Sequence, residues 1–156
     1  MLSEDVLEFL RSRPIAMLCT RDGDNRPSIH EAFLADIAPD RIIVMVPAHL
    51  ARHLTANAHD NGAAALLVSR APGDHRSVQM KGRIDDIDDA AVRPELFEST
   101  LPLIDVYRAF LPEEQARELW ERMRLQSAHR ISFEVAQVFD QTPGPGAGAR
   151  MSGGAA

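Results

Sequence analysis

The sequence predicts a mainly β fold with helices: one six-stranded antiparallel barrel, with an N-terminal helix and a helical insert before the last strand. Three observations predict it. Most of the first 85 residues alternate apolar and polar side chains with the period of a strand. Turn residues such as Asp22-Gly23 separate these stretches at hairpin spacing. Helical spacing is confined to the N-terminus, a short central stretch and residues 88–125.

The first element is a helix over residues 3–13, where Ser3 is the expected N-cap and Pro14 ends the helix. A second, short helix is predicted over 48–57 from the spacing of Leu50 and Leu54. Runs rich in β-branched and apolar residues predict the strands. These lie at 15–20, 26–37, 41–46, 62–69, 75–85 and 129–140.

Two strands each show one apolar and one polar face, which leaves a polar face for a ligand or a partner subunit. In 26–37 the expected apolar residues are Ile29, Phe33, Ala35 and Ile37, opposite Arg26, Ser28 and His30. In 75–85 they are Val78, Met80 and Ile84, opposite Ser77, Gln79 and Lys81. In the last strand Ile131, Phe133, Val135 and Phe139 are expected to share one face.

The region 88–125 is predicted to be helical, most clearly over 112–125, where an apolar stripe follows Pro112. The tail after the last strand is rich in proline, glycine and alanine. We therefore expect a barrel domain over 1–148 and a flexible tail over 149–156.

Charge and composition exclude several classes of protein. A net charge of −6 and a pI near 5.5 argue against a nucleic-acid-binding protein, which usually presents a basic face. No apolar run reaches the roughly 20 residues that cross a bilayer, and the acidic start does not resemble a secretory signal. A single cysteine, Cys19, excludes an internal disulfide and any multi-cysteine zinc site. We expect a cytoplasmic protein.

Three segments together offer groups that suit a phosphate-bearing aromatic cofactor. They are the polar face of 26–30, the loop and helix start at 46–53, and the strand at 75–82. Arginine, lysine and helix N-terminal amides bind phosphate because they supply positive charge and fixed donors. Basic residues on solvent-facing strands are also common without a ligand, so the pattern alone leaves both interpretations open.

The segments RPSIHE, VMVPAHLARHLTAN and HRSVQMKG, in this order, resemble the pyridoxamine 5′-phosphate oxidase-like family. The most specific part is Arg76, Val78 and Gly82, which are similar to the Arg-x-Val-x-x-x-Gly strand of that family. The resemblance implies the FMN-binding split-barrel fold and a homodimer with FMN in a groove between the two subunits.

Residue types and resemblance together predict the cofactor contacts. These are Arg26, Ser28, His30, Val46, Pro47, His49, Arg52, His53, Arg76, Ser77, Gln79 and Lys81. The chain departs from the family at Glu31, where oxidases tend to carry lysine, and at His49 and Leu50, where they tend to carry an Arg-Lys pair. No metal site and no catalytic side chain is predicted.

The first functional hypothesis is an FMN-dependent oxidoreductase related to pyridoxamine 5′-phosphate oxidase, acting on a small-molecule substrate with an electron donor such as NAD(P)H. The alternative is a non-enzymatic split-barrel protein that binds a flavin or haem. His30, His49 and His53 are the histidines considered for haem, which some relatives of this fold bind. The sequence leaves the substrate and the role of the helical insert open.

Overall fold

The computed structural model describes residues 1–70, 73–91, 107–123 and 127–151. Its strands are β1 (Ile15–Arg21), β2 (Pro27–Ile37), β3 (Arg41–Pro47), β4 (Ala63–Ser69), β5 (Ser77–Ala91), β6 (Ser127–Asp140) and β7 (Arg150–Met151). The helical segments are α1 (Glu4–Arg11), the 3₁₀ turn η1 (Ala48–Leu50), α2 (Arg52–Asp60) and α5 (Glu113–Met123). No helix among these residues is long and apolar enough to cross a membrane.

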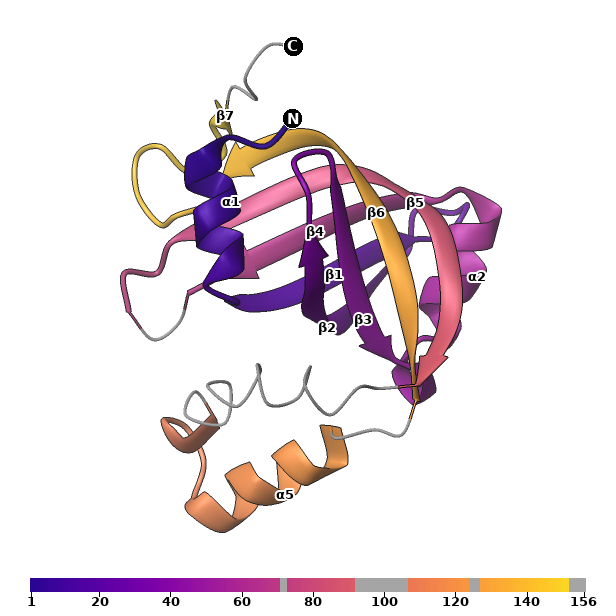
Figure 1. Cartoon of the computed structure of the whole chain (residues 1–156), viewed down its shortest axis with the longest axis vertical. Coiled ribbons are helices and arrows are strands. Elements are labelled where there is room, and N and C mark those ends of the chain that lie inside the picture. The colour runs from indigo at the N-terminus through magenta and orange to yellow at the C-terminus, as the bar shows by residue number, and fades with distance from the viewer. Residues whose placement is uncertain (71–72, 92–106, 124–126, 152–156) are drawn as a thin grey trace.

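The strands form one antiparallel sheet in the order β3-β2-β1-β4-β5-β6-β7. The first and sixth strands of this order, β3 and β6, also pair with each other over Arg41–Pro47 and Ala128–Glu134. This pairing closes six strands into a barrel, which confirms the predicted fold class (Figure 1). In a closed barrel every strand has one inward and one outward row of side chains.

Two helices cover opposite ends of the barrel (Figure 1). α1 begins at Ser3, whose hydroxyl accepts a hydrogen bond from the Val6 amide, as the sequence predicts. The amide of Leu2 donates to the carbonyl of Pro39 in the β2–β3 turn. α2 contacts β1, β2 and β4 near the other end of β2, and Asn61 donates to the carbonyl of Arg21.

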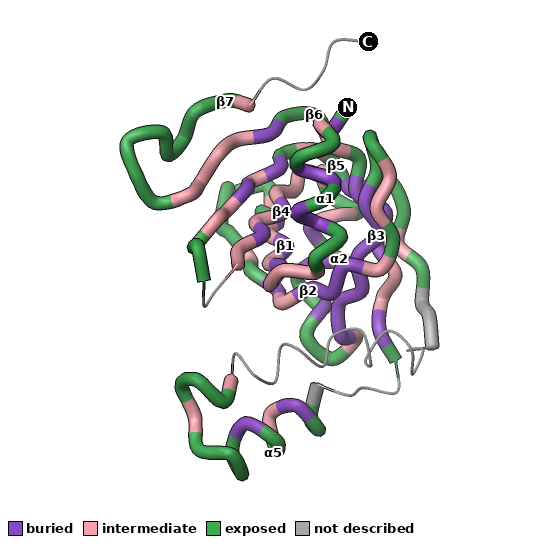
Figure 2. The backbone as a smooth tube through the Cα atoms, turned by 60° about the vertical axis from the view of Figure 1, so that its left-hand side comes forward, coloured by how far each residue is buried: buried purple, intermediate pink, exposed green. Residues whose placement is uncertain are grey.

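The core fills the inside of the barrel and extends under α1 and α2. Figure 2 shows the buried segments gathered in the strands, while the turns are exposed. The largest fully buried side chains include Phe9 and Leu10 of α1, Leu54 of α2 and Phe133 of β6. Val78, Met80 and Ile84 of β5 also face this core, as predicted. Burying these apolar surfaces is the main stabilising contribution to the fold.

A β-bulge interrupts the pairing of β5 with β6. Lys81 lies opposite Gln137 and Gly82 lies opposite Val135, so Ala136 has no partner on β5. A Cβ atom on Gly82 would lie 1.8 Å from the carbonyl oxygen of Glu134. Glycine is therefore required at this position, because any side chain would collide with the backbone of β6.

Several predicted boundaries are wrong. β5 continues to Ala91, so residues 88–91 are strand and not the start of the helical insert. β6 begins at Ser127, and the single predicted helix over 48–57 is a 3₁₀ turn followed by α2. Arg150 and Met151 pair with β6 rather than belonging to a free tail. The helix expected between 92 and 106 lies outside the described residues.

The predicted faces of the strand at 26–37 are reversed for most of its length. His30, Ala32 and Leu34 are buried, whereas Ile29 is 62% exposed. The alternation misleads because both faces carry apolar residues: the outward Phe33 packs in a second cluster with residues near α5. A register shift between Leu34 and Asp36 then changes the alternation at the end of the strand.

In β6 the bulge changes which residues face inward. Ile131 and Phe133 are buried, as predicted, but beyond Ala136 it is Val138 that is buried. Phe139 faces outward, and the ammonium of Lys81 lies 4.8 Å from its ring centre. The prediction that Phe139 shares the inward face is therefore wrong, since one extra residue moves it to the other side of the sheet.

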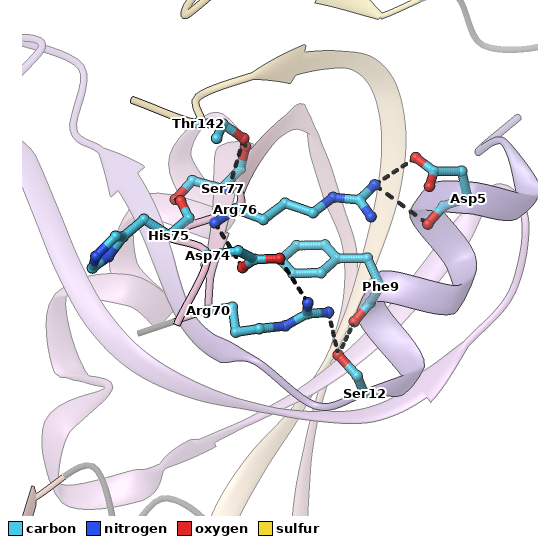
Figure 3. A network of polar contacts seen from close by, with 9 residues as sticks. All are labelled: Asp5, Phe9, Ser12, Arg70, Asp74, His75, Arg76, Ser77 and Thr142. Carbon is cyan, nitrogen blue, oxygen red and sulfur yellow. Dashed lines mark hydrogen bonds and ion pairs between the residues drawn. The ribbon is translucent and has the colours of Figure 1, made fainter. Parts of the chain in front are cut away.

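Two arginines of the connection between β4 and β5, Arg70 and Arg76, hold α1 against the barrel. The guanidinium carbons of Arg70 and Arg76 lie 5.2 Å and 4.7 Å from the centre of the Phe9 ring. Figure 3 shows the ring between the two side chains, with Arg76 also bonded to Asp5 and Arg70 to Ser12. These contacts fix α1 to a segment 58 to 71 residues later in the chain.

Replacing Gly82 by alanine should destabilise the protein by about 1–3 kcal/mol, because the new methyl group forces β6 away from β5 at the bulge. Urea denaturation followed by circular dichroism measures the loss. Gly146→Ala is the matched control, since a Cβ there meets no atom within 4 Å. Equal stability of the two variants would contradict the geometry of the bulge.

Candidate functional site

Three of the predicted cofactor residues lie on the outer side of β5, as expected. Ser77, Gln79 and Lys81 alternate with the buried Val78 and Met80. The hydroxyl of Ser77 lies 2.8 Å from that of Ser69 on β4, and Gln79 accepts a hydrogen bond from Gln141. Lys81 rests over the ring of Phe139.

Two outward rows of side chains cross β2, β1, β4 and β5 in register. One row is Ile29, Cys19, Ala65 and Lys81, and the other is Glu31, Met17, Leu67 and Gln79. Each row spans three strand spacings, or about 14 Å. We call these eight residues the outer face. None of its apolar members belongs to either hydrophobic cluster of the described residues.

The neighbouring part of the outer surface, over β2, β3 and β6, is covered. Phe33, Met45 and Ala128 are buried there, with Tyr107 and Leu119 packed against them. Leu119 belongs to α5, which lies outside the barrel (Figure 1). The outer face therefore begins where this covering ends, at β2.

The turn η1 and the start of α2 carry three more predicted residues, all exposed: His49, Arg52 and His53. The N-cap position, Ala51, supplies no side-chain acceptor, so the first amides of α2 keep their hydrogen-bonding capacity. Within the described part of the chain Arg52 forms no ion pair. An uncapped helix start with an unpaired guanidinium is suited to an anionic group.

Val46 and Pro47, at the end of β3, are buried. Val46 is 0% exposed and belongs to the core, so its side chain is not available to a ligand. Its backbone leads directly into η1 and α2. These two residues fix the path of the loop that presents Arg52.

Ser28 and His30 point into the barrel rather than to its surface. Asn57 of α2 donates to the hydroxyls of Thr20 and Ser28. His30 is 7% exposed, and its Nε2 has no hydrogen-bond partner among the residues that the structure describes. Burial lowers the pKa of His30, and the backbone carbonyl of Leu50 offsets part of that effect. His30 is therefore a neutral barrel residue beside the start of α2.

Both predicted cofactor-binding arginines outside α2, Arg26 and Arg76, are bound to carboxylates of their own chain. Arg26 lies 3.7 Å from Asp22 and 3.2 Å from Asp24, within the β1–β2 turn. Arg76 pairs with Asp5 and stacks on Phe9. In this arrangement Arg76 anchors α1 instead of facing a ligand.

A single chain therefore brings together only part of the predicted set. His30, His49, Arg52 and His53 gather at the start of α2, while Ser77, Gln79 and Lys81 lie together on β5 across the outer face. A cavity of about 480 Å³ lies elsewhere, between Met1, the bulged part of β6 and β7. None of the predicted cofactor residues lines it.

Two contacts of this region are not predicted from the sequence. One is the buried Asn57, which ties α2 to β1 and β2. The other joins Glu31 of the outer face to the hydroxyl of Tyr107, which lies 76 residues later. An asparagine on the apolar side of a short amphipathic helix, three residues after Leu54, is the only sequence signal for the first contact.

Cys19 lies on the outer face and not in the core, although the strand pattern predicts burial. It is partly exposed, and burial of its thiol raises its pKa above the ordinary value. A neutral thiol is a poor nucleophile. Among the residues that the structure describes, no three histidine, cysteine or acidic side chains are grouped to hold a metal ion.

Comparison with solved structures finds the same fold in several bacterial proteins. HupZ from Group A Streptococcus is 14% identical with a TM-score of 0.56, over 95% of this chain and 100% of that one. A pyridoxamine 5′-phosphate oxidase-like protein from Lactobacillus delbrueckii is 13% identical, with a TM-score of 0.54 over 88% and 93% of the two chains. An FMN-binding protein from Syntrophomonas wolfei is 14% identical, with a TM-score of 0.51 over 87% and 86%.

No curated protein sequence is similar enough to this chain to count as a match. The sequence model of the family described as pyridoxamine 5′-phosphate oxidase, in contrast, matches residues 2–131, from the start of α1 into β6. With the closed barrel and its outer face, this match identifies the chain as a member of the pyridoxamine 5′-phosphate oxidase family.

Proposed function

We propose that this protein is an FMN-binding homodimer and an oxidoreductase of the pyridoxamine 5′-phosphate oxidase-related class. The observation that carries the proposal is the outer face, a set of apolar side chains in register that ends beside an uncapped helix start. Family membership supports a flavin as the ligand, as does the shared fold of the FMN-binding Syntrophomonas protein.

The phosphate would lie at the start of α2. This helix has nine residues and no side-chain cap, so its free amides and its dipole favour a negative charge there. The guanidinium of Arg52 and the imidazole of His53 are exposed at the same place. Arg26 and Arg76 are less suited to this task, because each already pairs with a carboxylate.

The ring system would lie along the outer face, between two copies of the chain. Met17 and Leu67 offer apolar surface, while Gln79 and Ser77 offer hydrogen-bonding groups at the far side. A specific dimer interface buries roughly 1,200–2,000 Å² in total. A second copy seated on this face would remove Ile29 from water and complete the groove, since one chain supplies only one wall.

A bound flavin would supply the redox chemistry. The chain supplies few groups for proton transfer on this face: Cys19 has a raised pKa, the ammonium of Lys81 lies over Phe139, and Glu31 accepts a hydrogen bond from Tyr107. Hydride transfer from a nicotinamide donor makes the smallest demand on such residues. We therefore propose NAD(P)H as the electron donor.

The same scarcity of acid–base groups favours the second candidate, a flavin-binding protein without enzymatic turnover. Oxidation of NAD(P)H by the flavin-loaded protein separates the two: steady consumption supports the oxidoreductase, and flavin uptake without consumption supports the binding protein. Haem receives little support, because His30 is buried within the barrel beside the Leu50 carbonyl.

The protein purified without added cofactor should show the absorption bands of oxidised flavin, or should acquire them on titration with FMN. Arg52→Ala should weaken FMN binding about tenfold, because it removes a charge-assisted contact to the phosphate. Riboflavin, which lacks the phosphate, should be affected much less. Quenching of flavin fluorescence measures both affinities.

Arg11→Ala is the control for this change, since Arg11 is an exposed arginine of α1 at the opposite end of the barrel. A loss of FMN affinity as large in the control as in Arg52→Ala would contradict the proposed phosphate site. A colourless protein that takes up neither flavin would contradict flavin binding altogether.

Ile29→Asp should convert the dimer into a monomer, because it places a charge within an apolar interface. Ile29 is 62% exposed in the single chain, so the substitution should leave the stability of the monomer nearly unchanged. Sedimentation velocity measures the mass. Ala147→Asp adds the same charge to an exposed loop and should remain dimeric; a monomeric wild-type protein would refute the interface.

A further inference from the structure

Glu31 is the one acidic residue of the outer face. It lies opposite Met17 on β1, between Ile29 and Phe33 on the outward side of β2. The preceding residue, His30, reaches the Leu50 carbonyl just before α2 begins. Glu31 therefore lies on the ligand side of β2, one residue from the strand position that touches the start of α2.

Among the described residues, the partner of the Glu31 carboxylate is a phenol. The hydroxyl of Tyr107 donates a hydrogen bond to Oε1 of Glu31. Within the described part of the chain, no arginine, lysine or histidine pairs with this carboxylate, and no donor reaches its Oε2. Among the described residues, no positive charge compensates this half-buried carboxylate, which lies in a row of apolar and amide side chains.

Tyr107 keeps the carboxylate in place without neutralising it. Burial, followed by the hydrogen bond and charge of Glu31, raises the pKa of Tyr107 above its ordinary value, so the phenol stays a donor. Its ring also packs beside Phe33 and Met45 in the cluster under α5. Tyr107 thereby fixes one oxygen of Glu31, while no described donor binds the other.

An ionised carboxylate only accepts hydrogen bonds. It repels phosphate and attracts a hydroxyl, an amide N–H or an ammonium group. We propose that Glu31, held by Tyr107, is a specificity-determining acceptor that turns away phosphate from this end of the outer face and takes a hydrogen-bond-donating part of the ligand. The proposal rests on the flavin site proposed above, in which the phosphate lies at the start of α2 and not on the outer face.

The test compares the affinities of the purified full-length protein for FMN and for riboflavin, which differ by the phosphate. Glu31→Gln keeps the shape of the side chain and removes its charge. It should raise the affinity for FMN relative to riboflavin about fivefold, the range of a partly exposed charge pair. Tyr107→Phe keeps the charge, so its FMN-to-riboflavin ratio should stay within about twofold of wild type.

Glu8→Gln is the matched control, because it removes one exposed negative charge from α1, away from the outer face. A ratio unchanged in Glu31→Gln, or raised equally in Glu8→Gln, overturns the proposal. A ratio raised equally in Tyr107→Phe shows that packing and not charge is responsible, and also overturns it.

If the wild-type protein binds neither FMN nor riboflavin, the proposed function is refuted. A second measurement then tests the role of Glu31 by itself. The probe is inorganic phosphate, and the readout is the thermal unfolding midpoint. Glu31→Gln should gain a larger phosphate-dependent rise in Tm than wild type and Glu8→Gln. An equal rise in all three proteins overturns the proposal.

Discussion

The pairing of β3 with β6 is the contact on which the rest of the structure depends. It closes the sheet, and a closed sheet sorts the side chains of every strand into an inner and an outer row. The inner rows form the core between α1 and α2, and α5 with Tyr107 covers part of the outer surface. What remains on β2, β1, β4 and β5 is the outer face, where apolar residues lie in register with a few polar groups.

Closure also requires departures from regular pairing, and these departures place several residues of the site. The bulge at Gly82 lets β6 bend across β5 and moves Phe139 outward, beneath Lys81. Polar contacts at the ends of the barrel hold the two helices in place. Asn57 holds α2 against β1 and β2, and the two arginines around Phe9 hold α1.

Local sequence patterns predicted the strands, the turns between them and the outward residues of β5. These features depend on side-chain alternation and on turn residues that lie close together in the sequence. The same patterns predicted the wrong inward face for β2, because two apolar residues lie on its outward side. Phe33 packs there in the cluster near α5, and Ile29 belongs to the outer face. The patterns also failed for the end of β5, where they assign residues 88–91 to the helical insert, since aspartate-rich sequence is untypical of a strand. The contacts of Arg76 and Glu31 could not be predicted either, because their partners Asp5 and Tyr107 lie 71 and 76 residues away.

The central claim is that the outer face is one wall of a flavin site that a second copy completes. Native mass spectrometry of the protein with FMN tests it most directly, because one spectrum gives the number of chains and of cofactors in each particle. The account predicts particles of two chains with two FMN molecules. A single chain, with or without FMN, as the dominant species under conditions that preserve known dimers would contradict it.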